Sequence, residues 1–476
     1  MRLFLINWSG KDLGLVDAAR ELKKSHQIFY WTCANAAKEI ASAEFQGTIL
    51  HDHFEALKGE PAKELADERF MPPDEELIKK LYEAESNVLT MMNKLFEALS
   101  VSERKHLYYL YVQYWNGVIQ KLKPNTIIFP TIPHTAYDFV IYALAKIYNV
   151  KTVMFEPLWV GDRMVGMNDY IDGPKISMEK SAFSSTEEAL NNISDDFRAE
   201  YASRVNTKKN DTTIFVKNIR KQYTGFKSLK IKLRSFWTTI TVLKDFSVFI
   251  KIITYLPRRL RANQKTEYTS LAAASDFSKK FIYLPLHYQP ERNSSPQGGV
   301  FVDQILMAAT LSAALPDGWF LYVKEHPTQW LFRGSDYFSY RFRGYYRAMA
   351  GLKNVRLLPM ETSSYELIER AEAVATITGT AGWEAVLRRK PVLIFGYPWY
   401  RNAPGIFRIW GADSCRDAIE KIKNGFSFSE EDIIKYLQVL DKATFHGYID
   451  FDGQKVSKLS PKENSINLTK AILSQL

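Results

Sequence analysis

The sequence alternates between short apolar segments rich in β-branched and aromatic residues and longer segments with helical periodicity, and it does so in both halves. The expected strands of the first half are 2–7, 27–32, 48–51, 126–130 and 152–155. Those of the second half are 281–286, 319–324, 355–358, 373–378 and 392–395. Strand–helix alternation predicts parallel sheets covered on both faces. We therefore predict an α/β protein of two doubly wound, Rossmann-like domains that face each other across a cleft.

Helical patterns fill the intervals between these strands. The expected helices are 15–24, a long pair within 74–121, 136–148, 302–315, 339–350, 364–371, 382–389, 430–444 and 465–476. The 476 residues exceed one ordinary core and suit two domains of roughly 150–250 residues each. We expect α/β domains over 1–204 and 271–410, a helical segment over 205–270, and C-terminal helices over 411–476 that pack back on the first domain.

Cysteine usage and hydropathy limit the cell compartment. Cys33 and Cys415 are the only two cysteines and lie far apart, which argues against a disulfide scaffold or a thiolate metal site. The start of the chain lacks a basic region followed by a long apolar one, so we expect no signal peptide. No uncharged apolar run reaches about 18 residues, so we expect no membrane-spanning helix. These features predict a cytoplasmic protein.

Positive charge is concentrated in one segment. Residues 205–265 contain 15 Lys and Arg against two acids, whereas the whole chain carries +10. An apolar stripe that includes Phe226, Phe236 and Trp237 accompanies the charge at helical spacing. Such a segment can dock peripherally on the anionic inner face of the inner membrane through its basic and aromatic side chains. The candidate docking residues are Lys227, Lys230, Lys232, Arg234 and Trp237. A helical pair that covers the core, or a dimer contact, is the alternative.

Polar residues follow three strands of the second half, where open α/β sheets bind ligands. Glu325, His326 and a proline follow the strand at 319–324. The histidine could donate to a phosphate or simply occupy a turn. Thr378, Gly379 and Thr380 follow the strand at 373–378 and begin a helix, whose N–H groups favour a phosphate.

Two further features complete this set of candidates. Glu384 lies one turn into the same helix and could accept hydrogen bonds from ribose hydroxyls; a surface glutamate is the alternative. The Pro/Gly-rich loop after the strand at 281–286 suggests a binding loop rather than a solvated connection. Its candidate binding residues are His287, Gln289, Glu291, Ser294, Ser295 and Gln297.

Three stretches together resemble the capsule polysaccharide biosynthesis family, which includes Kdo transferases of bacterial capsule synthesis. They read LPLHYQPERNSSPQGGVFVDQ, LYVKEHP and TITGTAGWEAVLRRKPVLIFG. The resemblance is clearest over 281–400 and moderate over 125–157. It implies a GT-B fold and a nucleotide-sugar donor, CMP-linked, with 271–410 as the nucleotide-sugar domain and 1–204 as the acceptor side. In related CMP-sugar transferases a His-Pro pair and a hydroxyl-rich turn hold the phosphate; His326 and Thr378–Thr380 match them here.

The acceptor side should hold a catalytic carboxylate or histidine. Glu156 follows the strand at 152–155, and His134 and Asp138 follow the one at 126–130. A carboxylate there could act as base or nucleophile, and a buried Glu156 or a helix-capping Asp138 are the alternatives. The sequence lacks an HExxH motif and a cysteine cluster, so we expect transfer without a metal or other cofactor.

The predicted function is transfer of Kdo or another nonulosonic acid from a CMP-sugar to a lipid-linked or oligosaccharide acceptor in capsular or lipopolysaccharide synthesis. A phosphotransferase of teichoic-acid type that uses a CDP-alditol is one alternative. A non-catalytic assembly factor docked on a membrane is another. DNA binding is disfavoured because no nucleic-acid module accompanies the basic segment.

Overall fold

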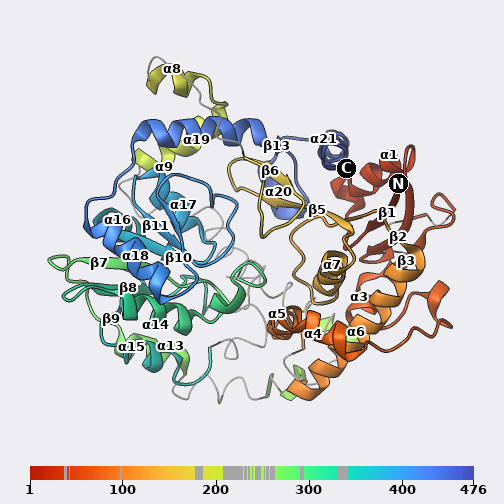
Figure 1. Cartoon of the computed structure of the whole chain (residues 1–476), viewed down its shortest axis with the longest axis horizontal. Coiled ribbons are helices and arrows are strands. Elements are labelled where there is room, and N and C mark those ends of the chain that lie inside the picture. Colours follow the sequence, from red (N-terminus) through yellow and green to blue (C-terminus); the bar gives the residue numbers. More distant parts are fainter. Residues whose placement is uncertain are drawn as a thin grey trace. The chain divides into compact units, whose positions relative to one another are not determined.

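The computed structural model describes residues 1–36, 40–41, 43–96, 99–176, 186–206, 263–289, 294–330 and 341–476, and scattered positions between 229 and 257 (Figure 1). The chain divides into two compact units. Unit 1 comprises Met1–Phe197 and Leu437–Leu476, and unit 2 comprises Arg198–Tyr436. The last forty residues therefore belong to the first unit.

Unit 1 is built on a seven-stranded sheet of order β13-β6-β5-β4-β1-β2-β3. Its strands are β1 (Arg2–Leu5), β2 (Gln27–Cys33), β3 (Ile49–Asp52), β4 (Thr126–Ile128), β5 (Lys151–Pro157), β6 (Arg163–Met167) and β13 (Phe445–His446). β1 to β5 pair in parallel, whereas β6 pairs antiparallel with both β5 and β13. The β5–β6 hairpin thus ends the parallel part of the sheet.

Most helices of unit 1 fall between these strands, and the last two follow β13 (Figure 1). They are α1 (Leu15–Lys23), α3 (His53–Leu57), α4 (Glu75–Lys80), α5 (Tyr82–Met92), α6 (Val101–Leu122), α7 (Tyr137–Ile147), α8 (Thr186–Asn191), α20 (Phe451–Val456) and α21 (Pro461–Gln475). The C-terminal helix α21 begins with a capping box between Ser460 and Glu463 and with Pro461 in its first turn. It packs on α1, so residues near both termini share one core.

Unit 2 is built on a fully parallel six-stranded sheet of order β12-β11-β10-β7-β8-β9. Its strands are β7 (Phe281–Pro285), β8 (Phe320–Lys324), β9 (Val355–Leu357), β10 (Ala373–Thr376), β11 (Val392–Ile394) and β12 (Ile406–Arg408). Its helices are α13 (Gln264–Leu271), α14 (Gln304–Ala314), α15 (Tyr345–Ala350), α16 (Ser364–Arg370), α17 (Thr380–Leu387) and α18 (Ala412–Lys423). Helices α9 (Asp195–Asn206) and α19 (Glu430–Ala443) cross from one unit to the other.

Each sheet has its own apolar core. In unit 2, Leu321 and Val323 of β8 alternate into a buried cluster with Met307 and Leu311 of α14. In unit 1, Leu3 and Leu5 of β1 alternate into a cluster with α1 and α21. This alternation is the period-two burial expected of strands. The predicted pair of doubly wound α/β units is therefore confirmed, and the cleft between them stays a prediction.

Several elements differ from the sequence-based expectation. No strand or helix was expected between the strand at 152–155 and the helical segment that starts at 205, but β6, α8 and most of α9 lie there. β12 and β13 have three and two residues, which is too short for a periodic signal. Helices α3, α18 and α20 are absent from the expected helices, whereas α13 overlaps the end of the segment 205–270 that was expected to be helical. Most of the basic segment 205–270, including Lys227, Lys230, Lys232 and Arg234, lies outside the described residues.

Candidate functional site

The strand order of unit 2 has one topological switch point, between β7 and β10. From β7 the chain continues to β8 and β9 on one side, and then returns to β10, β11 and β12 on the other. In open α/β sheets ligands bind outside the carboxyl ends of the strands at such a switch point. The residues after β7, β8 and β10 therefore define the candidate site.

His287 joins the loops that follow β7 and β10. Its Nε2 lies 3.2 Å from the backbone nitrogen of Ile377 and 3.0 Å from Oγ1 of Thr376. Because the N–H of Ile377 donates to Nε2, the neutral ring carries its proton on Nδ1. Burial, and next the charge of Arg341, lower the pKa of His287 to about 4. His287 is therefore neutral at pH 7 and acts as an internal acceptor at the switch point.

The turn between β10 and α17 contains the predicted residues Thr378, Gly379 and Thr380. The N–H of Gly379 donates to Oγ1 of Thr376 at 3.0 Å. A Cβ at Gly379 would lie 2.9 Å from that Oγ1 and 3.2 Å from Cε1 of His287, so only glycine allows this close approach. Gly379 is the N-cap of α17, and no side chain caps the helix. The first N–H groups of α17 can therefore bind an anion.

His326 lies half-buried after β8, and its ring lies near that of Tyr288, with centroids 6.0 Å apart. Nδ1 of His326 accepts the N–H of Thr328 at 3.3 Å and lies 2.8 Å from its Oγ1. The proton of the neutral ring therefore sits on Nε2, which can donate. The loops after β7, β8 and β10 thus converge, with a donor histidine on one of them.

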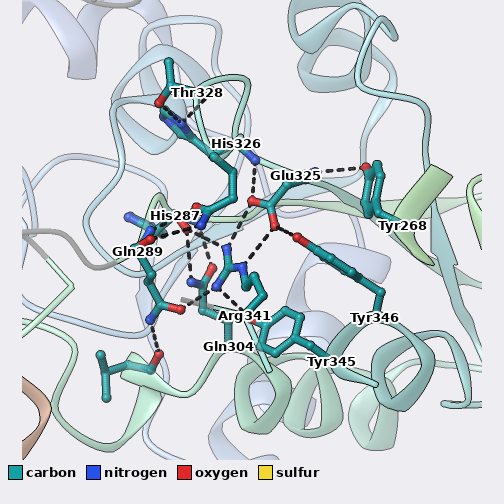
Figure 2. A network of polar contacts seen from close by, with 12 residues as sticks. Tyr268, His287, Gln289, Gln304, Glu325, His326, Thr328, Arg341, Tyr345 and Tyr346 are labelled. Atoms are coloured by element: carbon teal, nitrogen blue, oxygen red, sulfur yellow. Dashed lines mark hydrogen bonds and ion pairs between the residues drawn. The ribbon is translucent and has the colours of Figure 1, made fainter. Parts of the chain in front are cut away.

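A buried ion pair braces two of these loops (Figure 2). Nε and Nη2 of Arg341 lie 3.1 Å from Oε2 and Oε1 of Glu325, and both side chains are fully buried. Nη2 of Arg341 also donates to the carbonyl oxygen of His287 at 2.9 Å. Oε1 of Glu325 accepts the backbone N–H of His326 at 2.6 Å, and Tyr346 donates to Oε2. The carboxylate of Glu325, a predicted nucleotide ligand, is thus engaged inside the protein.

The remaining residues of the loop after β7 are also packed. Oε1 of Gln289 accepts from Arg341, and its Nε2 donates to the carbonyl oxygen of Val302 at 2.8 Å. The amide of Gln297 donates to the carbonyl oxygen of Tyr397 at 3.0 Å. Ser294 and Ser295 are buried in the same turn. Glu291 lies outside the described residues.

Glu384 and Lys324 form a second charged group in unit 2. Oε1 of Glu384 accepts from Nη1 of Arg204 at 2.7 Å, and burial raises the pKa of Glu384. Burial lowers the pKa of Lys324 to about 8, with Glu361 and Glu384 opposing the shift. Nζ of Lys324 donates to the carbonyl oxygen of Thr362 at 2.8 Å. Because pH 7 lies below this pKa, Lys324 is a buried cation at the end of β8.

Unit 1 has the three predicted catalytic residues at two separate places. Asp138 is buried, and its carboxylate accepts the N–H of Thr135 at 2.7 Å. Burial raises the pKa of Asp138 to about 6, against hydrogen bonds from its own turn. Nδ1 of His134 lies 2.7 Å from the carbonyl oxygen of Ile132. Glu156 is half-buried near the carboxyl end of β5, where it pairs with Val165 of β6.

Trp237 is helical and 60% exposed. Within the described ranges, no group of three or more His, Cys, Asp or Glu could hold a metal ion. No helix in these ranges is long and apolar enough to cross a membrane.

Three side chains that build the site were not among the predicted site residues. Thr376 was placed inside a strand that was expected to run to 378, although it ends that strand and bonds His287. Lys324 is a charged residue at the end of an apolar strand, which was a usable signal. Arg341 lies far from Glu325 along the chain, so no local pattern could have revealed the ion pair.

Comparison with known proteins gives a family match over this site. Residues 288–425 match the family described as capsule polysaccharide biosynthesis protein. Capsule polysaccharide modification protein LipA of Neisseria meningitidis serogroup B (strain ATCC BAA-335 / MC58) is 31% identical over 96 residues. This match covers 20% of this chain and 12% of the relative, so the chain spans only a small part of that protein's length.

Solved structures give weaker similarities. Thermosulfurimonas dismutans KpsC, beta Kdo 2,7 transferase, is 13% identical with a TM-score of 0.30, over 80% of this chain and 94% of the other. A second structure, Thermosulfurimonas dismutans KpsC, beta Kdo 2,4 transferase, is 12% identical with a TM-score of 0.31. The match covers 66% of this chain and 79% of the other. In contrast, the match of residues 288–425 to the capsule polysaccharide biosynthesis family includes His326 and the turn at 378–380.

Proposed function

We propose that this protein is a glycosyltransferase of bacterial surface-polysaccharide synthesis. It would take a sugar, Kdo or another nonulosonic acid, from a CMP-linked donor and transfer it to a lipid-linked or oligosaccharide acceptor. The family match over residues 288–425 supports a role in capsule polysaccharide biosynthesis. The donor and the acceptor are inferences from the chemistry of the site.

The observation that carries the proposal is the convergence of three loops at the switch point of unit 2. His287 bonds the β10 turn, and His326 contacts Tyr288 of the loop after β7. A nucleotide phosphate at this edge would meet the Nε2–H of His326 and the uncapped N-terminus of α17. The Nε2–H of His326 and the N–H groups at the start of α17 would both direct partial positive charge at the leaving phosphate.

A CMP leaving group has a single phosphate. Its charge is smaller than that of a nucleoside diphosphate, so a histidine and a helix N-terminus could stabilise it without a metal ion. The buried cation of Lys324 lies at the end of β8, the strand that His326 follows. We propose CMP rather than a nucleoside diphosphate because these groups suit the smaller charge of a single phosphate.

Unit 1 would hold the acceptor and the essential carboxylate. Glu156 is half-buried at the end of β5, whereas Asp138 is enclosed by its own turn. We therefore favour Glu156 as base or nucleophile, depending on the stereochemical outcome.

We also propose that residues 205–260 dock the protein on the cytoplasmic face of the inner membrane. The segment is strongly basic. Of its described residues, Leu229, Leu233 and Trp237 recur every four positions and are 54%, 51% and 60% exposed. Ile250 and Ile253 are 64% and 75% exposed. Exposed apolar side chains beside many cations fit an interfacial segment.

The test begins with a thermal-shift screen of CMP, CDP, UDP and GDP, followed by the matching nucleotide sugars. The true donor nucleotide should raise Tm because it binds only the native state. His326→Ala should then lower turnover by roughly ten- to a thousand-fold, as expected for the loss of one preorganised donor.

The outcomes separate the candidate functions. CMP-sugar turnover supports the proposal, whereas turnover of CDP-glycerol alone would indicate a phosphotransferase. Binding of no cytidine nucleotide would favour an assembly factor. Wild-type activity in His326→Ala would overturn the assignment of that residue.

A further inference from the structure

Backbone conformation singles out one edge of unit 1. In the described part of the chain, seven non-glycine residues have positive φ. Three of them lie at helix C-termini, where this conformation is common: Lys123, Asn149 and Arg389. The other four follow the carboxyl ends of four parallel strands of unit 1: Asn7 (φ 56°), Asn35 (φ 54°), Ala136 (φ 64°) and Trp159 (φ 60°). Such strain outside helix ends is typical of functional sites.

The strand order places this edge at a second switch point. From β1 the chain continues to β2 and β3 on one side, and then returns to β4 and β5 on the other. The switch point therefore lies between β1 and β4, where Asn7 and Ala136 follow their strands. By the same rule that located the site of unit 2, a ligand crevice is expected here.

His53 begins α3 directly after β3 and is joined to this edge by a chain of hydrogen bonds. Its Nδ1 lies 2.9 Å from the phenol oxygen of Tyr137. Tyr137 donates to Oγ1 of Thr32 at 3.2 Å, and that oxygen also accepts the N–H of Asn7 at 2.5 Å. His53, Tyr137, Thr32 and Asn7 therefore connect the ends of three strands with the first turn of α7.

The direction of these bonds fixes the tautomer of His53. Because the phenol proton of Tyr137 points to Thr32, the phenol oxygen accepts from Nδ1–H of His53. Nε2 then carries the lone pair, and among the described residues no hydrogen bond engages it. Tyr137 is buried and stacked on Trp115, with ring centroids 5.8 Å apart, so it holds the imidazole in a fixed orientation.

The surroundings of His53 keep its ring neutral. Burial lowers the pKa of His53 to about 4, with the charge of Asp52 opposing the shift. The carboxylate of Asp52 accepts the N–H groups of Phe54 and Asn35 at 2.8 and 2.9 Å, which also holds the turn after β2 in place. The half-buried imidazole is thus in the form that can accept a proton.

We propose that His53, in place of Glu156, is the catalytic residue that accepts the proton of the acceptor hydroxyl, at this edge of unit 1. This role rests on the proposed function. The acceptor oxygen forms its bond to the anomeric carbon of the donor sugar while the bond from that carbon to the phosphate oxygen of CMP breaks. The hydroxyl proton passes to Nε2 of His53, and CMP leaves with the electron pair. Tyr137 is a positioning residue that acts through Nδ1.

The experiment measures CMP release and product mass with CMP-Kdo as donor and an n-octyl Kdo glycoside as acceptor probe. If the wild type transfers no sugar to this probe, hydrolysis of CMP-Kdo by water is the readout, since water must lose a proton in the same way. His53→Gln should lower the rate by roughly 10²- to 10⁴-fold, the contribution of a positioned base. The rise in Tm caused by CMP should equal that of the wild type.

Two further variants keep the test decisive. His106→Gln makes the same substitution at an exposed histidine of α6 and should retain the wild-type rate. Tyr137→Phe keeps the ring stack but removes the acceptor of Nδ1–H, and should lower the rate about tenfold without changing the KM for CMP-Kdo. Tyr137→Phe carries the test if His53→Gln does not fold.

The failure of each idea has its own signature. A His53→Gln rate within about threefold of the wild type, or an unchanged rate in Tyr137→Phe when only that variant folds, overturns the role of His53. A wild type that neither binds CMP nor releases it from CMP-Kdo overturns the proposed function itself, and the role of His53 with it.

Discussion

At the scale of single residues, hydrogen-bond direction gives the two histidines of unit 2 opposite properties. Nε2 of His287 accepts the N–H of Ile377, whereas Nδ1 of His326 accepts the N–H of Thr328. His287 therefore presents an acceptor inside the protein, and His326 presents an Nε2–H donor. Two residues of one type thus have different tasks, a structural one and a phosphate-binding one.

The low pKa of His287 leads to a pH-dependent stability. Its pKa is about 4 in the folded protein against 6.5 as a free side chain, so the unfolded chain binds more protons between these values. This stabilising contribution is complete above pH 6.5 and is lost as pH falls toward 4. We expect His287 to account for a loss of about 2 kcal/mol between pH 7.5 and 5. Urea denaturation of the wild type and His287→Gln measures this, and equal pH slopes would contradict it.

The two carboxylates of unit 1 should respond differently to amide substitution. If Glu156 rather than His53 reacts, Glu156→Gln should lower kcat by roughly 10²- to 10⁴-fold with little change in Tm, because a reacting carboxylate would be lost. Asp138→Asn should mainly destabilise, by about 1–3 kcal/mol, because the buried carboxylate organises the N–H groups of its turn. Activity and thermal unfolding of both variants test the assignment. Near-normal rates in both would place the catalytic group elsewhere.

At the scale of elements, the loops after β7 and β8 are held together by Arg341, which lies outside both strands and both loops. Arg341 lies three residues before the residue that caps α15 and reaches the carbonyl oxygen of His287 as well as the carboxylate of Glu325. Tyr345, in the same helix, places its ring 4.6 Å from the guanidinium carbon of Arg341. Figure 2 shows how Arg341 and Glu325 connect Gln289 and His326 in one hydrogen-bond network.

We predict that stability and nucleotide binding separate when this ion pair is replaced. Arg341→Met alone leaves Glu325 buried without its cation and should cost about 3–5 kcal/mol. The double variant Glu325→Leu with Arg341→Met removes both charges and should recover most of that loss. CMP affinity, measured by titration calorimetry, should stay low in the double variant because the His326 loop has lost its anchor. Wild-type affinity there would show that the ion pair has only a structural role.

At the scale of the whole molecule, charge is distributed unevenly between the basic segment and the rest of the chain. The net charge of residues 205–265 is +13, more than the +10 of the whole chain. Surface attraction of this kind is screened beyond a Debye length of about 8 Å at physiological salt. Binding through this segment should therefore depend on salt and on anionic lipid.

We predict that the protein sediments with vesicles that contain phosphatidylglycerol, and less with pure phosphatidylcholine or at high salt. Changing Lys227, Lys230, Lys232 and Arg234 together to Gln should weaken binding by up to about a thousandfold, at roughly 1 kcal/mol per cation. The matched control changes Lys353, Arg416, Lys421 and Lys423, which are exposed in unit 2, to Gln and lowers the net charge equally. Equal sedimentation of both variants at low salt would contradict docking by this segment.

The sequence by itself determined the fold class and the loops of the candidate site. Strand and helix periodicity depends on near neighbours in the chain, so the two α/β patterns could be read directly. The same holds for the histidine after β8 and for the glycine turn before α17, since each follows a strand at once.

Tertiary structure decided which of these residues meet and what each can do. Only the strand order shows that β7 and β10 are neighbours, which brings His287 against Thr376. Only packing pairs Arg341 with Glu325, and only it joins His53 to Tyr137 and Thr32 across 84 and 105 residues of chain between the successive partners. Burial and hydrogen-bond direction arise when distant segments exclude water from one another. They set protonation and tautomer, and a local pattern does not contain them.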